Sequence, residues 1–256
     1  MTKLAAIVLT KNEEQHIGAC LDSLAWAERR VVFDSFSTDR TCEIAREHGA
    51  EALQHPFSDY AAQRNAALLA VEAEWAFFVD ADERVTPELA EEINGTIGAH
   101  SEEVAGWYVP RRNYLFGRLT RGAGYWPDYQ MRLLKHGRAR YDRPASEIVE
   151  LEGQAGYLQN ALLHYNYDTI AQFHQKQTFR IDFEAVNLYQ RREKYRFYSP
   201  YAMSLRHFWW RYMTLKGYRD GWHGLRLCWL LAYYFGYRYY QRLGQLYRSG
   251  LKPSDN

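Results

Sequence analysis

The sequence predicts an α/β protein, in which a mostly parallel sheet flanked by helices is followed by a helical extension rich in basic and aromatic residues. Short apolar runs alternate with helix-like segments over residues 4–99, as in such sheets. Hydrophobic residues make up 47% of the 256 residues, enough for a substantial core. Residues 1–175 hold 17 Lys+Arg and 26 Asp+Glu, whereas residues 176–256 hold 15 and 5. The two regions are therefore expected to face different partners.

The predicted sheet begins with "LAAIVL", residues 4–9, a wholly apolar run typical of a strand buried on both faces. Asn12, with a glutamine three residues later, predicts the N-cap of a helix that runs to about Leu24. A strand over residues 30–33 and a helix over residues 41–49 follow, and a glycine closes that helix. These elements form the first strand–helix–strand unit.

The alternation continues with a weak strand over residues 51–54, an alanine-rich helix over residues 60–71 and an apolar strand over residues 75–79. Thr86-Pro87 supplies an N-cap and a proline at the first helical position, which predicts a helix over residues 87–99. Strands that alternate with helices imply right-handed crossovers and an open sheet.

Polar side chains follow three of these strands: Thr10, Asp34, and the pair Asp80 and Asp82. Ligands of open α/β sheets bind beyond the carboxyl ends of the strands, so these groups are expected at one edge. The chain lacks GxGxxG and GxxxxGK[ST], and a Mg²⁺ or Mn²⁺ ion held by the aspartates would have to neutralise phosphate. Alternatively, the DxD motif is a solvated turn or helix-capping cluster, Asp34 an Asx-turn residue and Thr10 a cap.

Four blocks of the sequence resemble successive motifs of a known family. They are "IVLTKNEEQHIGACLDSL", "VVFDSFSTDRTCEIAREHGA", "YAAQRNAAL" and "WAFFVDADERVTPEL", which together cover about the first half of the chain. They are similar to family 2 glycosyltransferases with the Rossmann-like GT-A fold, and within that family to bacterial lipopolysaccharide core glucosyltransferases. The resemblance implies sugar transfer from a nucleotide-sugar donor, with UDP-glucose as the first expectation.

The resemblance implies a role for each strand-end residue. Thr10 would lie near the nucleobase and ribose, and Asp34 would bond to the uracil edge. Arg64 would approach the nucleotide, because a guanidinium matches phosphate. Asp80 would reach the ribose or a metal-bound water, and Asp82 would coordinate the Mn²⁺ or Mg²⁺ that bridges the diphosphate.

The middle of the chain is expected to supply the base and contact the acceptor. Inverting transfer needs one carboxylate to deprotonate the attacking hydroxyl. Asp128 resembles the Asp of the family's "ED" motif, although Pro127 stands where Glu is expected. Glu147, in an "ASE" that resembles the family's "VHE", competes with it, and we favour Asp128. Either carboxylate could instead be an ion-pair partner of Arg132, Arg140 or Arg143.

His164 follows a short apolar strand, and the resemblance offers it as a ligand of the metal or a contact of the diphosphate. A histidine in such a place is also often structural.

The chain after Asp168 interleaves Trp and Tyr with Arg, and glycines divide it into two helices. This composition fits attachment to an anionic membrane surface, and it equally fits a basic helical hairpin whose aromatic residues are core. Without an RRM, OB or helix-turn-helix signature, nucleic acid is not expected as a partner.

The predicted organisation is a GT-A catalytic domain at 1–167, with a nucleotide-sugar half at 1–100 and an acceptor half at 101–167, then a helical extension at 168–256. The predicted reaction moves one sugar from a UDP-hexose to a glycolipid, lipopolysaccharide-type or other saccharide acceptor. The expected location is the cytoplasm, at the cytoplasmic face of the inner membrane. A nucleotidyltransferase acting on sugar phosphates and a non-catalytic, membrane-bound sugar-nucleotide binder remain as alternatives.

Overall fold

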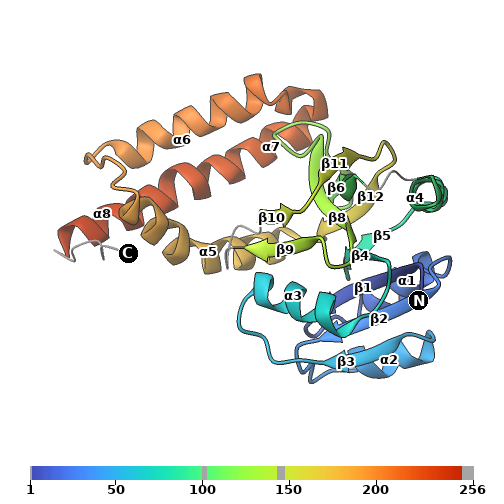
Figure 1. Ribbon diagram of the computed structural model, residues 1–256. Coiled ribbons are helices and arrows are strands. Elements are labelled where there is room, and N and C mark those ends of the chain that lie inside the picture. The colour runs from blue at the N-terminus through green and yellow to red at the C-terminus, as the bar shows by residue number, and fades with distance from the viewer. Residues whose placement is uncertain (1, 100–102, 143–147, 250–256) are drawn as a thin grey trace. The chain divides into compact units, whose positions relative to one another are not determined.

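The computed structural model describes residues 2–99, 103–142 and 148–249 (Figure 1). The chain forms two compact units. We call the first the sheet unit; it comprises Met1–Arg112 and Asp128–His164. The second, the helical unit, comprises Asn113–Pro127 and Tyr165–Asn256. Two strands, β6 (Val104–Leu115) and β12 (Leu162–Tyr167), pass from one unit into the other.

The sheet unit contains the strands and helices of the predicted alternation and several further strands. Its strands are β1 Leu4–Thr10, β2 Arg29–Asp34, β3 Glu51–Gln54, β4 Trp75–Asp80, β5 Glu83–Arg84, β8 Asp128–Lys135, β9 Ala139–Asp142, β10 Ile148–Leu151 and β11 Gln154–Tyr157. Its helices are α1 Ile17–Ser23, α2 Thr41–Glu47, α3 Tyr60–Ala70 and α4 Pro87–Gly98.

The main sheet has the strand order β3-β2-β1-β4-β8-β6-β12-β5, with β11 pairing β6. Strands β3, β2, β1 and β4 run parallel, whereas β8 pairs antiparallel with both β4 and β6. Thr10 is in register with Asp34, and Leu9 is in register with Asp80. The carboxyl ends of β1, β2 and β4 therefore meet at one edge. The predicted α/β class with a mostly parallel, helix-flanked sheet is confirmed.

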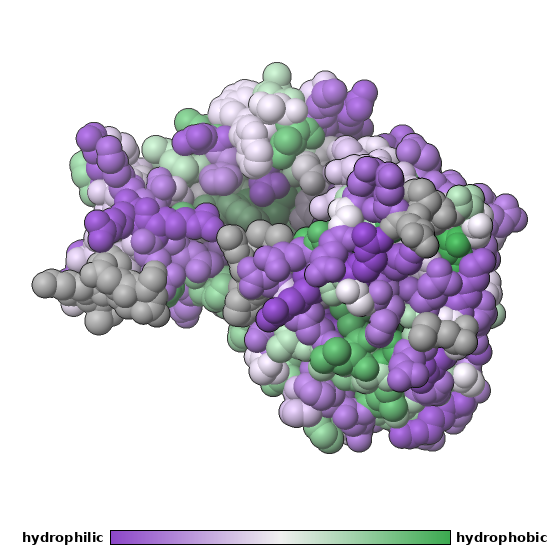
Figure 2. Space-filling view, viewed as in Figure 1, coloured by the Kyte–Doolittle hydropathy of each residue, from purple (hydrophilic) through white to green (hydrophobic). Residues whose placement is uncertain are grey.

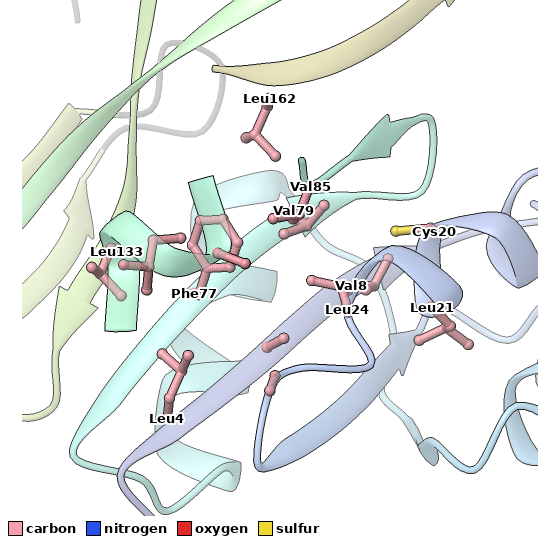
Figure 3. Packing of buried hydrophobic residues seen from close by; sticks show 14 of the residues in the cluster. Leu4, Val8, Cys20, Leu21, Leu24, Phe77, Val79, Val85, Leu133 and Leu162 are labelled. Atoms are coloured by element: carbon pink, nitrogen blue, oxygen red, sulfur yellow. The ribbon is translucent and has the colours of Figure 1, made fainter. Parts of the chain in front are cut away.

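The central strands β1 and β4 are buried on both faces because nearly all of their residues are apolar. In β1, Leu4, Ala6 and Val8 belong to one core cluster, while Ala5 and Ile7 belong to the other. The same alternation holds in β4, so successive side chains serve opposite faces. Helices α1 and α4 cover the first cluster, part of which Figure 3 shows, and α3 contributes to the second.

A local signal explains the start of α4. Thr86 Oγ1 accepts a hydrogen bond from the Leu89 N–H at 3.2 Å, and Pro87 opens α4, as the sequence predicts. The predicted Asn12 cap is wrong. Asn12 has a φ of 56°, and its side-chain oxygen accepts from the Thr38 N–H at 2.8 Å. It braces a neighbouring loop, and the helix begins later, at Ile17.

The helical unit is built from α-helices joined through π and 3-10 turns. Its elements are β7 Arg118–Leu119, α5 Ile170–Gln190, α6 Ser199–Trp209, η1 Trp210–Thr214, η2 Gly217–Asp220, α7 Gly221–Leu231, η3 Ala232–Arg238 and α8 Tyr239–Arg248. A capping box of Thr169 and Gln172 starts α5. No helix among the described residues is both long enough and apolar enough to cross a membrane.

Helix α6 lies beside the α7–η3–α8 segment (Figure 1), and small residues make their crossing close. A Cβ atom on Gly236 of η3 would lie 2.3 Å from Ser204 Cα of α6, which excludes a larger residue. The core of this unit includes Phe173, Leu227 and Tyr234. Some aromatic residues of the extension are therefore core, while others, such as Trp222, are exposed.

Candidate functional site

The carboxyl ends of β1 and β2 are joined through Asp34. Its side chain is fully buried and accepts hydrogen bonds from Thr10 Oγ1 at 3.0 Å, the Ser37 N–H at 2.8 Å and Gln54 Nε2 at 3.2 Å. Burial alone would raise the pKa of Asp34, but these hydrogen bonds outweigh it and lower the pKa. Asp34 is thus an ionised anchor for the loop after β2. Its predicted contact with uracil stays a prediction, and a base would have to compete with these donors.

That loop carries a feature that the sequence analysis missed. Phe36 has a φ of 57°, which is uncommon for an aromatic residue, and its side chain is 51% exposed. Lys11 holds the loop in place, because its Nζ donates to the Ser35 carbonyl at 2.7 Å. An apolar ring is therefore presented to solvent two residues beyond Asp34.

Asp80 ends β4 and is held by two arginines. Arg132 Nη1 donates to Asp80 Oδ1 at 3.1 Å, and Arg64 Nη2 donates to the same oxygen at 3.3 Å. Burial would raise the pKa of Asp80, but the charges of Arg132 and Arg64 hold it well below its usual range. Arg64 lies over the rings of Phe78 and Tyr141, with its Cζ 5.2 and 5.5 Å from their centroids. The predicted residues Arg64 and Asp80 are therefore brought together.

The ion pairs continue inward from Arg132. Its Nη2 lies 2.7 Å from Oε1 of Glu83, a fully buried residue, and Arg111 Nη1 lies 3.3 Å from the same oxygen. The other Glu83 oxygen accepts the Asp80 N–H at 2.9 Å. Arg111 Nη2 also lies 2.7 Å from Asp128 Oδ2. We call this chain the charge ladder; its members in order are Arg64, Asp80, Arg132, Glu83, Arg111 and Asp128.

Asp128 opens β8 and forms an ion pair with Arg111 of β6. Its second oxygen, Oδ1, accepts from Gln130 Nε2 at 2.9 Å. An ion pair with an arginine was the alternative to a role as base, and the partner, Arg111, is not among the arginines named for it. The competing base candidate, Glu147, lies outside the described residues.

Asp82 and His164 come together through the pairing of β5 with β12. Glu83 is in register with His164, and Asp82 Oδ2 lies 3.5 Å from His164 Nε2. The described residues hold no group of three or more His, Cys, Asp or Glu side chains placed to bind a metal. A carboxylate with an imidazole still fits Mn²⁺ or Mg²⁺, because such ions take few protein ligands when they bind a substrate diphosphate.

Three further residues of this site, Glu83, Arg111 and Gln54, were missed by sequence reasoning. Glu83 directly follows the DxD motif, and an apolar strand leading into three acids is a usable signal for it. Arg111 and Gln54 carry no local signal, because each reaches its partner through the pairing of neighbouring strands.

Comparison with known proteins gives consistent results. The model of the family described as Glycosyl transferase family 2 matches residues 5–164. The chain is 33% identical over 175 residues to the lipopolysaccharide core biosynthesis glycosyltransferase LpsC of Rhizobium meliloti, which covers 63% of each protein. An uncharacterized glycosyltransferase of Rickettsia felis is 25% identical over 228 residues, covering 82% of this chain and 77% of that one.

A solved structure supports the fold. It is the mannosyltransferase PcManGT of Pyrobaculum calidifontis in complex with GDP-Man and Mn²⁺, with a TM-score of 0.51 and 15% identity. The match covers 72% of this chain and 62% of that one. Since the family model matches more than half of the chain, the protein belongs to glycosyl transferase family 2.

Proposed function

We propose that the protein is an inverting glycosyltransferase that moves one hexose from a UDP-sugar to a glycolipid or related saccharide acceptor. The observation that carries the proposal is the Asp82–His164 pair next to Asp80, an aspartate kept ionised by two arginines at the carboxyl end of the parallel sheet. Ligands of such sheets bind at this edge. Membership of glycosyl transferase family 2 supports the reaction class.

The donor would bind across the ends of β1, β2 and β4. Thr10 and Asp34 fix the loop beside the nucleobase, and the exposed ring of Phe36 offers a stacking face for it. Arg64 keeps Asp80 charged and oriented toward the ribose or a bound water. These residues would orient the donor without taking part in bond making.

Asp82 and His164 would hold Mn²⁺ or Mg²⁺. The ion would neutralise the negative charge that grows on the departing diphosphate. The two side chains supply a carboxylate oxygen and an imidazole nitrogen. Asp82 directly precedes β5, and the pairing of β5 with β12 brings it to His164.

Asp128 would be the base. Its carboxylate would take the proton of the acceptor hydroxyl while that oxygen bonds to the anomeric carbon, and the bond to the diphosphate would break on the opposite face, releasing UDP. Arg111 holds Asp128 from one side and orients it. Glu147 remains the competing candidate.

A lipid-borne acceptor would bring the enzyme to the cytoplasmic face of the inner membrane, and the name of the Rhizobium relative supports a lipopolysaccharide-type acceptor. The chain spans 63% of that relative, so its whole activity is not transferred. Within the chain, we assign the nucleotide sugar to residues 1–100, the acceptor to 101–167 and an accessory helical part to 168–256.

A panel of UDP-, GDP- and dTDP-hexoses tests the proposal. Calorimetric titration with and without Mn²⁺ should give metal-dependent binding of a UDP-hexose, and incubation with lipid-linked saccharides should release UDP. Release of pyrophosphate from a nucleoside triphosphate and a sugar phosphate would instead identify a nucleotidyltransferase. Donor binding without turnover on any acceptor would identify a non-catalytic binder.

A further inference from the structure

The helical hairpin of α6–η1 and α7–η3 exposes large apolar side chains at helical spacing. On α6 and η1 these are Tyr201, Leu205, Trp209 and Met213; on α7 and η3 they are Trp222, Trp229 and Tyr233. Steps of four and seven residues put each set along one side of its helix. Two of the side chains, Trp222 and Tyr201, are 76% and 67% exposed, so they contribute little to the core.

Ring contacts join the two lines into one surface. Tyr201 lies 5.5 Å from Tyr237, which stacks on Tyr233 at 5.9 Å. Phe208 lies 5.8 Å from Trp209 and 5.0 Å from Trp229. We call this surface the aromatic face. It is formed by Tyr201, Leu205, Trp209, Met213, Trp222, Trp229 and Tyr233. A continuous exposed apolar surface marks an interaction site more often than isolated apolar residues do.

The charges around the aromatic face have one sign. Within residues 199–238, all of them described, the exposed charged side chains are Arg206, Lys216, Arg219 and Arg226. The one acid in this stretch, Asp220, is half-buried and accepts hydrogen bonds from the backbone N–H groups of Arg121 and Gly122. None of the four cations forms an ion pair with a described carboxylate. Figure 2 shows weakly polar side chains mixed with strongly hydrophilic ones over α6, at the top of the view.

We propose that the aromatic face lies in the headgroup layer of an anionic bilayer. Trp and Tyr rings favour the boundary between headgroups and acyl chains, and the flanking cations attract anionic headgroups. Four cations of one sign would repel each other across a contact between two copies of the chain, which disfavours self-association through this face. The proposal deepens the proposed function, because a lipid-borne acceptor would be met at the same surface, but its test needs neither donor nor acceptor.

The test is co-sedimentation of the full chain with vesicles of phosphatidylcholine alone or mixed with phosphatidylglycerol. The protein should bind the mixed vesicles and bind the neutral ones far less. Joint replacement of Arg206, Arg219 and Arg226 by Gln should weaken the partition coefficient about 100-fold, since each cation near such a surface contributes about 1 kcal/mol. A charge-matched control, with Arg46, Arg112 and Arg140 replaced by Gln, should bind like the wild type.

The apolar part of the contact needs its own variant. Joint replacement of Leu205, Trp209 and Trp222 by Ser should remove the binding that persists at high salt, and brominated lipids should quench tryptophan fluorescence in the wild type but much less in the variant. The matched control replaces three exposed apolar residues elsewhere: Phe57, Leu69 and Phe179. Circular dichroism confirms that each variant is folded.

Three results would overturn the proposal. One is equal binding of folded wild type and folded face variants to mixed vesicles. Another is a dimer that the apolar variant dissociates, with no vesicle binding, which would assign the face to a second copy. The last is tight binding of a single-stranded oligonucleotide that the arginine variant abolishes, again without vesicle binding. Sugar transfer can fail while vesicle binding stands, so the two proposals fail separately.

Discussion

The two units use charge in opposite ways. In the sheet unit, the arginines of the charge ladder face carboxylates, and Glu83 and Arg132 are almost completely buried. In the helical unit, exposed cations stand among exposed aromatic rings without acidic partners in the hairpin. Paired buried charges fix the geometry of a site, because removing one partner leaves the other uncompensated. Unpaired surface charges attract a partner from outside. The arginines of the charge ladder thus serve internal order, whereas the exposed arginines of the hairpin would attract a partner from outside.

Of the substitutions that test this comparison, one at Asp82 in the sheet unit should have the largest effect on ligand binding. Asp82→Asn should abolish metal-dependent UDP binding and sugar transfer, because a neutral amide cannot replace the carboxylate beside His164. Titration calorimetry with UDP and Mn²⁺ measures it. Asp142→Asn, at an exposed acid of β9, should leave binding unchanged. Wild-type affinity for UDP and Mn²⁺ in Asp82→Asn would remove Asp82 from the metal site.

The next effect is at the end of the charge ladder. Asp128→Asn should lower kcat by roughly 10²- to 10⁴-fold while donor binding is retained, as expected when a general base is lost. Steady-state kinetics alongside calorimetry separate the two quantities. If Glu147→Gln silences transfer and Asp128→Asn does not, the base is Glu147.

Glu83→Gln tests whether the ladder is a structural unit. The change leaves Arg132 and Arg111 short of one buried negative charge and should lower the free energy of unfolding by about 3–5 kcal/mol. Urea unfolding measures it, and Glu152→Gln, at an exposed acid, is the control. A loss as small as that of the control would mean that the sheet unit does not depend on its buried charges.

The smallest expected effect is a loss of stability at acid pH, which should begin at a higher pH in the helical unit than in the sheet unit. Burial, helped by the charges of Arg211 and Arg206, lowers the pKa of His207 to about 4, whereas an unfolded histidine has a pKa of about 6.5. The unfolded state therefore binds a proton first as the pH falls through this window, and stability is lost there by at most about 3 kcal/mol. Asp34 and Asp80 have lowered pKa values, so their contribution is present above about pH 4 and is lost only below it.

Urea unfolding near pH 7 and near pH 5 measures this loss, and His207→Gln should reduce the difference but not remove it, because burial also lowers the pKa of His223. Hydrogen exchange of peptides from each unit locates it. An equal loss of protection in both units would show that the helical unit has no acid sensitivity of its own.

Sequence reasoning went furthest where the signal is local. The apolar runs of β1 and β4 and the Thr86-Pro87 start of α4 are contained in a few consecutive residues, and each prediction is confirmed. The prediction of Asn12 as a helix N-cap was wrong because its side chain accepts a hydrogen bond from a loop 26 residues away. The partner of Asp128 was not predicted because this contact is also distant in the sequence. Arg111 reaches Asp128 through the antiparallel pairing of β6 with β8.

The candidate site divides in the same way. Asp80, Asp82 and Arg64 stand in recognisable blocks, and the structure brings Asp80 to Arg64 and Asp82 to His164. The side-chain oxygens of Asp34 accept hydrogen bonds from Thr10 and from nearby donors. Its position after a strand did not predict these bonds. Hydrogen-bond saturation is a property of the folded loop, which a sequence does not display.

The charge ladder has a thermodynamic consequence for ligand binding. Its three guanidinium groups and three carboxylates sum to zero, so the ladder by itself offers no net charge to either ligand. At the proposed site, the Asp82 carboxylate beside the ladder would offset part of the charge of a divalent ion, whereas a diphosphate without the ion would enter with its charge uncompensated. Their affinities are therefore expected to be cooperative, each ligand strengthening the other by the same factor. If the proposed function holds, the nucleotide and the cation would neutralise each other at a site whose three ladder arginines are already paired with carboxylates.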